Sequence, residues 1–192
     1  MAIPSSHADK KEAVRRHALA RRKAMDEIER IEKSLALVDH VDDLPLPEEA
    51  IVSGFWPIRD EIDIRPLMDA LRQRGHPLCL PAIAEPHLEF RRLERDSELV
   101  PAGFGTLEPA PSAEKMRPDV MLMPLSGFDG AGNRLGYGKG HYDTAIAAIK
   151  REGPLLCIGV AFAVQEVDRV PFEAHDKPLN GILTEVGYRA FS

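Results

Sequence analysis

The sequence predicts an α/β fold, a three-layer α/β/α sandwich with a mostly parallel central sheet and a basic N-terminal helix. Continuous apolar runs at residues 120–125 and 155–162 are typical of strands buried on both faces. Helix-like segments alternate with such runs, which favours parallel strands joined by crossovers. The chain has 192 residues, 44% hydrophobic and 29% charged, and this suits a single globular domain over residues 1–192.

The first predicted element is a helix over residues 8–24. Lys11, Arg15 and Arg22 lie within about 40° of one another on it, at about 100° per residue. The first 25 residues hold seven Lys or Arg and two acids, whereas the whole chain has a net charge of −6. Such a helix suits a phosphate ligand, a nucleic acid, or docking on the acidic remainder of the chain.

A second helix is predicted to begin at Asp26, with Glu29 as its capping-box partner. Its apolar positions recur at helical spacing: Ile28, Ile31, Leu35 and Val38. The two prolines within residues 44–47 end it.

The remaining elements alternate between strand and helix. Helices are expected over residues 65–74, with Pro66 in the first turn and Gly75 as the stop, and over residues 140–150. Pro77 and Pro81 make the strand at 76–83 short or an edge. Residues 94–117 are rich in Pro, Gly and charge and are expected to form a loop. The expected strands are residues 50–56, 76–83, 88–93, 120–125, 155–162 and 181–188.

The most informative feature is a glycine ladder, residues 136–140, in which Gly136, Gly138 and Gly140 alternate and Lys139 is enclosed. It follows an apolar strand and precedes a helix, an arrangement that points backbone N–H groups at an anion. A lysine inside the ladder favours phosphate as that anion. The alternative is a tight connection in which the glycines serve turn geometry alone.

Several side chains around the ladder have two possible roles. Asp143 either favours the helix dipole from the first turn or is an oxygen ligand for Mg²⁺. Tyr137, His141 and Tyr142 either stack on a flat heterocycle or pack against the sheet, and packing is favoured for Tyr142. Arg134 adds a second positive charge beside the ladder.

Composition excludes several classes of protein. Cys79 and Cys157 lie in apolar runs and are expected to be reduced and buried, and the Cys and His residues lack metal-site spacing. The longest apolar stretch, residues 154–164, is too short to span a bilayer, and the N-terminus lacks a signal core. We therefore expect a cytoplasmic protein with no membrane partner.

The segment Gly-Phe-Asp-x-x-Gly-Asn-Arg-Leu-Gly-x-Gly-Lys-Gly-x-Tyr-Asp, residues 127–143, resembles the signature of the 5-formyltetrahydrofolate cyclo-ligase family, also called methenyltetrahydrofolate synthetases. Three other segments are similar to parts of the family: the basic N-terminal helix, residues 55–62 and residues 175–185. The resemblance covers nearly the whole chain and is weakest around residues 84–117.

The resemblance implies an ATP-dependent cyclisation of 5-formyltetrahydrofolate to 5,10-methenyltetrahydrofolate, with release of ADP and phosphate. Lys11 and Arg15 would reach the ATP phosphates, and Lys139 and Arg134 would act on the transferring group. Asp143 would hold Mg²⁺. The ATP-binding residues implied are Lys11, Arg15, Arg134, Leu135, Gly136, Tyr137, Gly138, Lys139, Gly140, His141 and Tyr142. The folate-binding residues implied are Trp56, Glu61, Tyr137 and His141, with Glu61 accepting hydrogen bonds from the pterin.

The chain departs from the family pattern at Tyr137 and His141. Asn180 stands where some members have an aspartate that joins the metal site, and amide oxygen is a weaker ligand. These departures leave open a same-fold enzyme acting on another heterocyclic or phosphorylated metabolite. A non-catalytic phosphate- or RNA-binding module is a further alternative, but the acidic remainder of the chain argues against nucleic acid as a partner. We expect a monomer or a homodimer.

Overall fold

The computed structural model describes residues 6–84, 87–103, 105–138, 140–173 and 176–191. Within these ranges, seven strands form one sheet in the order β11-β10-β9-β6-β1-β2-β3. Neighbouring strands from β10 to β2 run parallel, and β11 and β3 add antiparallel strands at the two edges. The prediction of an α/β fold with a mostly parallel sheet is therefore confirmed.

The elements have the following bounds. The helices are α1 His7–Ala24, α2 Glu27–Ala36, α3 Arg65–Gln73 and α4 His141–Glu152, with 3₁₀ helices η1 Leu37–Asp43 and η2 Ala163–Gln165. The strands are β1 Val52–Ser53, β2 Leu78–Ala84, β3 His87–Arg92, β4 Leu99–Pro101, β5 Leu107–Pro109, β6 Val120–Pro124, β7 Gly127–Phe128, β8 Arg134–Leu135, β9 Leu156–Val160, β10 Gly181–Thr184 and β11 Gly187–Ala190. None of the helices in these described ranges is long and apolar enough to cross a membrane.

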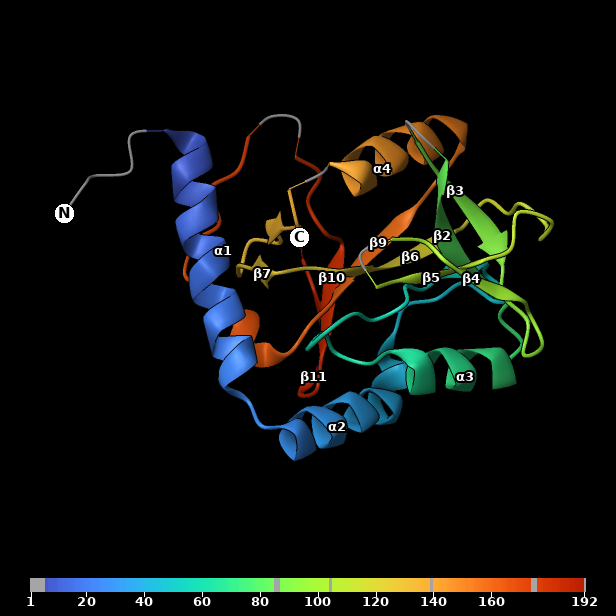
Figure 1. Cartoon of the computed structure of the whole chain (residues 1–192), viewed down its shortest axis with the longest axis horizontal. Coiled ribbons are helices and arrows are strands. Elements are labelled where there is room, and N and C mark those ends of the chain that lie inside the picture. Colours follow the sequence, from blue (N-terminus) through green and yellow to red (C-terminus); the bar gives the residue numbers. More distant parts are fainter. Residues whose placement is uncertain (1–5, 85–86, 104, 139, 174–175, 192) are drawn as a thin grey trace.

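Helices cover both faces of the sheet, with α2 and α3 on one side and α4 on the other (Figure 1). The alternation of β6 explains the two layers, because successive side chains of a strand point to opposite faces. Val120 and Leu122 pack into the core that contains α3, whereas Met121 and Met123 pack into the core that contains α4. The basic helix α1 instead stands at one end of the sheet and contacts β7 and η2.

The second predicted helix is shorter than expected, because α2 ends at Ala36 and η1 continues the chain as a 3₁₀ helix. Asp26 caps α2 by accepting a hydrogen bond from the Glu29 amide at 2.8 Å. The Glu29 carboxylate pairs with Lys33 at 2.9 Å, so the box that we predicted is only half formed. The apolar positions of α2 are also more exposed than a core-facing stripe would be: Ile28 69%, Ile31 53% and Leu35 53%.

Four predictions need correction, one for a loop and three for strands. Residues 94–117 are not all loop, because β4 and β5 pair there as a hairpin. The final predicted strand is two strands, β10 and β11, and the first is reduced to β1. The strand β2 is internal, because it pairs with β1 on one side and with β3 on the other. Pro81 is tolerated there because β1 pairs only with Leu78 and Cys79, so the missing amide of Pro81 is not needed for pairing with β1.

Candidate active site

A cavity of about 1160 Å³ lies at the carboxyl ends of the parallel strands, where open α/β sheets bind ligands. It is larger than the roughly 300–1,000 Å³ that is typical of a pocket for one small molecule. Its walls come from α1, the loop after β1, the ends of β2 and β6, the hairpin β4–β5, the glycine ladder, the first turns of α4 and the segment before β10. The cavity is therefore slightly larger than an ordinary pocket for one small molecule.

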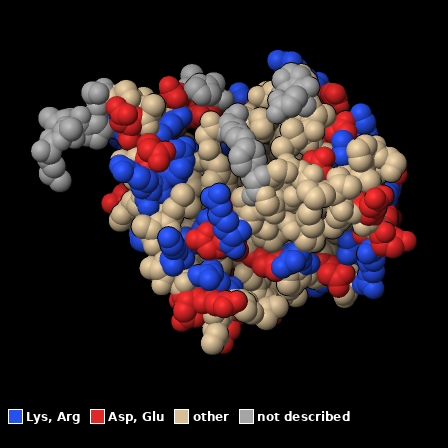
Figure 2. All heavy atoms as spheres, viewed as in Figure 1, with Lys and Arg blue, Asp and Glu red and all other residues tan. Residues whose placement is uncertain are grey.

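The α1 wall of this cavity carries two cations, Lys11 and Arg15, and two acids, Asp9 and Glu12. Lys11 Nζ donates to Asp176 at 2.7 Å and to Glu173 at 3.0 Å. Burial alone would lower the pKa of Lys11, but the two carboxylates outweigh it and raise the pKa, so Lys11 stays charged. Arg15 Nε donates to the carbonyl of Gly136 at 2.9 Å and so attaches α1 to the ladder. Blue side chains accordingly gather over α1, with acidic ones beside them (Figure 2).

The ladder borders open space at Gly136 and Gly140, whereas a Cβ built on Gly138 would lie 3.8 Å from the Arg15 guanidinium. Gly138 and Gly140 have φ values of 91° and 67°, which glycine adopts far more easily than other residues, so turn geometry is one reason for the glycines. No described atom lies within 4 Å of a Cβ built on Gly136 or Gly140, so the ladder also leaves room for a ligand. Lys139, the predicted catalytic lysine, lies outside the described residues.

Arg134 and Asp143 lie together where the ladder meets α4. Arg134 comes from β8, and its Nη2 donates to Asp143 Oδ1 at 2.8 Å. The same oxygen accepts the amide of Lys177 at 3.2 Å. Asp143 is also in the first turn of α4, where a negative charge favours the helix dipole. Both predicted readings of Asp143 therefore agree with its position, and the side chain also lines the cavity.

The arrangement does not support Asn180 as a partner of Asp143 in metal binding. Asn180 precedes β10, and its Oδ1 accepts the amide of Cys157, near the start of β9, at 2.8 Å. Because β9 and β10 are parallel, this contact lies toward their amino ends, and Asn180 does not line the cavity. Within the described ranges, no group of three or more His, Cys, Asp or Glu side chains is placed to hold a metal ion.

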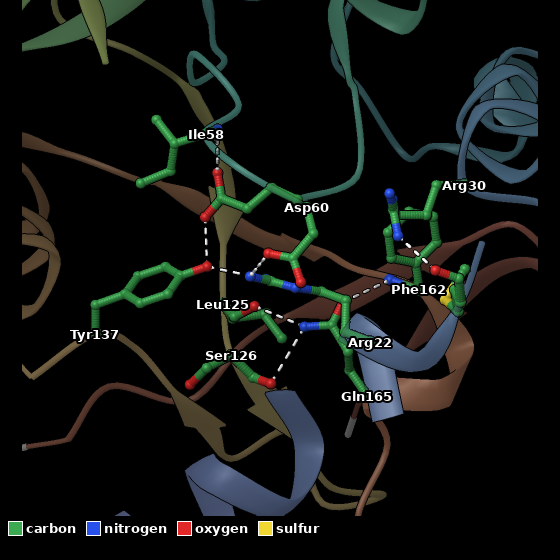
Figure 3. A network of polar contacts seen from close by, with 11 residues as sticks. Arg22, Arg30, Ile58, Asp60, Leu125, Ser126, Tyr137, Phe162 and Gln165 are labelled. Atoms are coloured by element: carbon green, nitrogen blue, oxygen red, sulfur yellow. Dashed lines mark hydrogen bonds and ion pairs between the residues drawn. The ribbon is translucent and has the colours of Figure 1, made fainter. Parts of the chain in front are cut away.

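A polar network at the cavity wall joins the ladder to the loop after β1 and to α1 (Figure 3). The Tyr137 hydroxyl donates to Glu61 Oε1 and accepts from Arg22 Nη1 at 3.0 Å. Glu61 Oε2 accepts the amide of Ile58 at 2.9 Å. Arg22 Nη2 donates to Asp60 at 2.8 Å. Residues from α1, the loop after β1 and the ladder are thus joined around one carboxylate.

Burial and hydrogen bonding compete at this carboxylate. Burial raises the pKa of Glu61, and the hydrogen bonds from Tyr137 and Ile58 and the charge of Arg22 lower it, with burial the stronger effect. Burial and the nearby Glu61 charge raise the pKa of Tyr137, so this phenol stays protonated and acts as a donor. Arg22 lowers the pKa of Asp60 despite the partial burial of that residue. The site thus holds a carboxylate that takes up a proton more readily than an exposed glutamate.

The aromatic residues that we predicted also reach the cavity. Trp56 lines it while packing against the core, and the Arg65 guanidinium lies 5.3 Å from its ring centre. Tyr142 lines the cavity and packs against the α4 core, as favoured for it. His141 opens α4 at the cavity wall. The predicted sites for ATP and folate, as far as they are described, are therefore brought together around one cavity.

The cysteines are core residues, as predicted. Cys79 and Cys157 are both buried and free. Burial raises the pKa of Cys79 to about 12, so its thiol is not a ready nucleophile.

The sequence did not predict that Arg22 and Asp60 belong to the polar network around Glu61. The helical phase did indicate that Arg22 shares a face with Lys11 and Arg15, but it assigned Arg22 no contact. Asp60 directly precedes Glu61 and showed no separate signal.

Comparison with known proteins agrees with this geometry. The sequence model of the 5-formyltetrahydrofolate cyclo-ligase family matches residues 7–185. The 5-formyltetrahydrofolate cyclo-ligase of Escherichia coli K12 is 31% identical over 140 residues, which are 69% of this chain and 76% of that protein. The mouse protein of the same name is 26% identical over 191 residues, covering 91% of this chain and 93% of its own.

Solved structures agree as well. The NMR structure of 5,10-methenyltetrahydrofolate synthetase from Aquifex aeolicus superposes with a TM-score of 0.77 and 28% identity, covering 94% of this chain and 92% of that one. The family match spans nearly the whole chain, including the ladder and the α1 cations. The chain therefore belongs to the 5-formyltetrahydrofolate cyclo-ligase family.

Proposed function

We propose that this protein cyclises 5-formyltetrahydrofolate to 5,10-methenyltetrahydrofolate, with ATP converted to ADP and phosphate. The printed names of its relatives support the reaction. The observation that carries the proposal is the single cavity whose walls hold both the glycine ladder with its cations and the Glu61 carboxylate. Two reactants bound in one cavity are held close enough to react.

ATP is required by the chemistry of ring closure. The formyl oxygen must leave, and oxide is a very poor leaving group. The formyl oxygen attacks the γ-phosphorus, the bond to ADP breaks, and a phosphate ester of an imidate forms. N10 of the folate then adds to the formyl carbon, its proton is lost, and the C–O bond breaks with departure of phosphate. The protein contributes positioning and neutralisation of phosphate charge.

Lys11, Arg15 and Arg134 are the described cations that we assign to the triphosphate. Lys11 and Arg15 line the cavity from α1, and Arg134 lines it beside the ladder. Their present partners are Asp176 and Glu173 for Lys11, Glu12 and the Gly136 carbonyl for Arg15, and Asp143 for Arg134. We expect the triphosphate to take over part of these contacts when it binds. Lys139 remains a prediction from the resemblance, in the role of contacting the transferring group.

Asp143 is the residue that we assign to Mg²⁺. Both hydrogen bonds that the described residues give it end on Oδ1, and its side chain lines the cavity. One carboxylate suits Mg²⁺ beside a nucleotide, because this ion usually keeps several waters and takes its other ligands from phosphates. Bound there, Mg²⁺ would neutralise charge on the phosphate oxygens.

The folate end of the cavity is assigned to Glu61 and Trp56, with Tyr137 and His141 on the ladder side. Glu61 supplies the acceptor that a pterin with N–H donors on one edge requires. Trp56 supplies an apolar surface for the ring.

The test is turnover of purified protein with ATP, Mg²⁺ and 5-formyltetrahydrofolate, followed by the near-UV absorbance of the methenyl product. We expect product that depends on ATP and appears with an equal amount of ADP. Absence of product at micromolar enzyme would overturn the proposal. Product without ATP consumption would overturn the mechanism.

A further inference from the structure

Tyr137 connects the glycine ladder to the carboxylate of Glu61, and the direction of its hydrogen bonds is fixed. Arg22 carries donors alone, and one of them points to the Tyr137 oxygen at 3.0 Å. The phenol proton must therefore be donated to Glu61. The network runs from Arg22 through Tyr137 to Glu61, and Figure 3 labels its first two members.

Glu61 keeps room for a ligand while it is held in this way. Oε2 accepts the amide of Ile58, and Oε1 accepts the Tyr137 hydroxyl. Each oxygen of an ionised carboxylate has two acceptor positions. One position on each oxygen thus remains for the cavity, and two parallel N–H donors on the edge of a heterocycle match that pair.

Arg22 is a fixed part of the protein interior. Its side chain is 5% exposed and is held by Asp60 through Nη2. Two turns earlier on the same helix, Arg15 holds the carbonyl of Gly136. Helix α1 therefore fixes the ladder backbone at Gly136 and the side chain of the next residue, Tyr137, at the same time.

We infer that Tyr137, supported by Arg22, is a positioning residue that orients Glu61 toward the donor edge of the bound heterocycle. The inference rests on the proposed function, because Glu61 is the residue expected to bind folate.

The charged and titratable groups around Glu61 are Tyr137, Tyr142 from α4, Arg22 from α1 and Asp60 from the same loop. Burial raises the pKa of Glu61, and among the effects that lower it the Tyr137 hydrogen bond is the largest. Loss of this hydroxyl should therefore favour the protonated carboxyl group, which is a poorer acceptor for a pterin.

The test compares Tyr137→Phe with Tyr188→Phe, a control that removes a hydroxyl on β11, outside the cavity wall. Calorimetry gives the Kd for 5-formyltetrahydrofolate, and initial rates give kcat and KM between pH 5 and 9. For Tyr137→Phe we expect about tenfold weaker folate binding, with kcat at saturating folate changed by less than about threefold. The acid limb of the kcat/KM profile should move to higher pH. Tyr188→Phe should match the unsubstituted protein.

Glu61→Gln supplies the second arm, because it removes the carboxyl group that titrates. In that background Tyr137→Phe should leave the position of the acid limb unchanged. Equal folate affinity and an unmoved acid limb in Tyr137→Phe, with the unsubstituted protein active, would overturn the inference alone. Failure of the unsubstituted protein to bind folate would overturn the proposed function and the inference with it.

Discussion

At Glu61, burial and hydrogen bonding act in opposite directions on one carboxylate. Burial raises its pKa, and two donors from different segments, the Ile58 amide and the Tyr137 hydroxyl, hold it in place. An ionised carboxylate in such a position is costly to the fold but is a strong acceptor for a ligand. The residue therefore fits a role in recognition better than a role in stability.

Glu61→Gln should impair folate binding selectively. The amide keeps the shape of the side chain but offers one acceptor oxygen and no charge, so a bidentate contact is lost. We expect the KM for folate to rise at least about tenfold, equivalent to about 1.4 kcal/mol, with the KM for ATP little changed. Steady-state kinetics with each substrate varied separately provide the measurement. An equal rise in both constants would indicate damage to the whole cavity instead.

Glu61→Gln should weaken folate binding but increase the free energy of unfolding. An acid whose folded pKa is raised loses native-state stabilisation as the pH rises from its unfolded pKa, about 4.3, through the folded pKa. Glu61→Gln removes this pH-dependent cost, so its advantage in the free energy of unfolding should be larger at pH 8 than at pH 4. Urea unfolding at the two pH values measures the difference. A variant that loses stability relative to the parent as the pH rises would contradict this reading.

At the scale of elements, α1 is the part that joins the two ends of the cavity. Ser6 and Asp9 form a capping box at its start, which fixes the first turn. Lys11 and Arg15 then line the end of the cavity that we propose for the phosphates, and Arg22 reaches the carboxylate network. Because these residues are one, two or three turns apart on one face, a single helix contributes to both proposed sites.

Lys11→Met tests whether α1 contributes to ATP binding through the position of Lys11. We expect a KM for ATP raised about tenfold and a KM for folate changed less than about twofold, because Lys11 lines the phosphate end. Lys10→Met is the matched control, since the neighbouring lysine is exposed and lies outside this cavity. Equal effects of the two substitutions would mean that the charge of α1 matters in general and the position of Lys11 does not.

The hairpin β7–β8 leads into the ladder, and Gly132 in the turn of this hairpin packs against Leu179 and Phe191, which flank the two C-terminal strands. Gly132 has a φ of 84°, and a Cβ there would lie 3.2 Å from the Leu179 carbonyl oxygen. Gly132→Ala should therefore cost about 2 kcal/mol or more in the free energy of unfolding. Gly103→Ala, with a φ of 77° and no atom within 4 Å, has the strain without the crowding and should cost less. Equal losses in denaturant unfolding would show that crowding contributes nothing.

For the whole molecule, local patterns predicted the parts that depend on local sequence. The spacing of residues at helical period predicted α1, and continuous apolar runs predicted β6 and β9. The spacing of the glycines predicted the ladder. The same kind of pattern indicated that α2 is a helix but not which face is covered, so the exposure of Ile28 was unexpected. The strands β4 and β5 were not predicted, because three residues each are too few to show the alternation of apolar and polar residues that is typical of a strand.

The sequence predicted which residues contribute to the candidate site but not the hydrogen bonds that join them. Glu61 and Tyr137 were both expected to touch folate, yet their hydrogen bond and its support from Arg22 join positions 22, 61 and 137. Such contacts depend on how three segments pack in space, and no local pattern encodes them. The direction of a side chain is similarly not encoded locally. Asn180 matches a position where some family members have a metal-site aspartate, yet its side chain accepts the amide of Cys157 in β9.

The central claim is that one cavity holds the nucleotide on the ladder and the pterin on Glu61. The most direct measurement is a crystal structure with 5-formyltetrahydrofolate and a non-hydrolysable ATP analogue. We predict the terminal phosphate against residues 136–140, near Lys11 and Arg15, and the donor edge of the pterin on Glu61. A structure with either ligand bound outside this cavity, or with the ladder closed against protein side chains, would contradict the account.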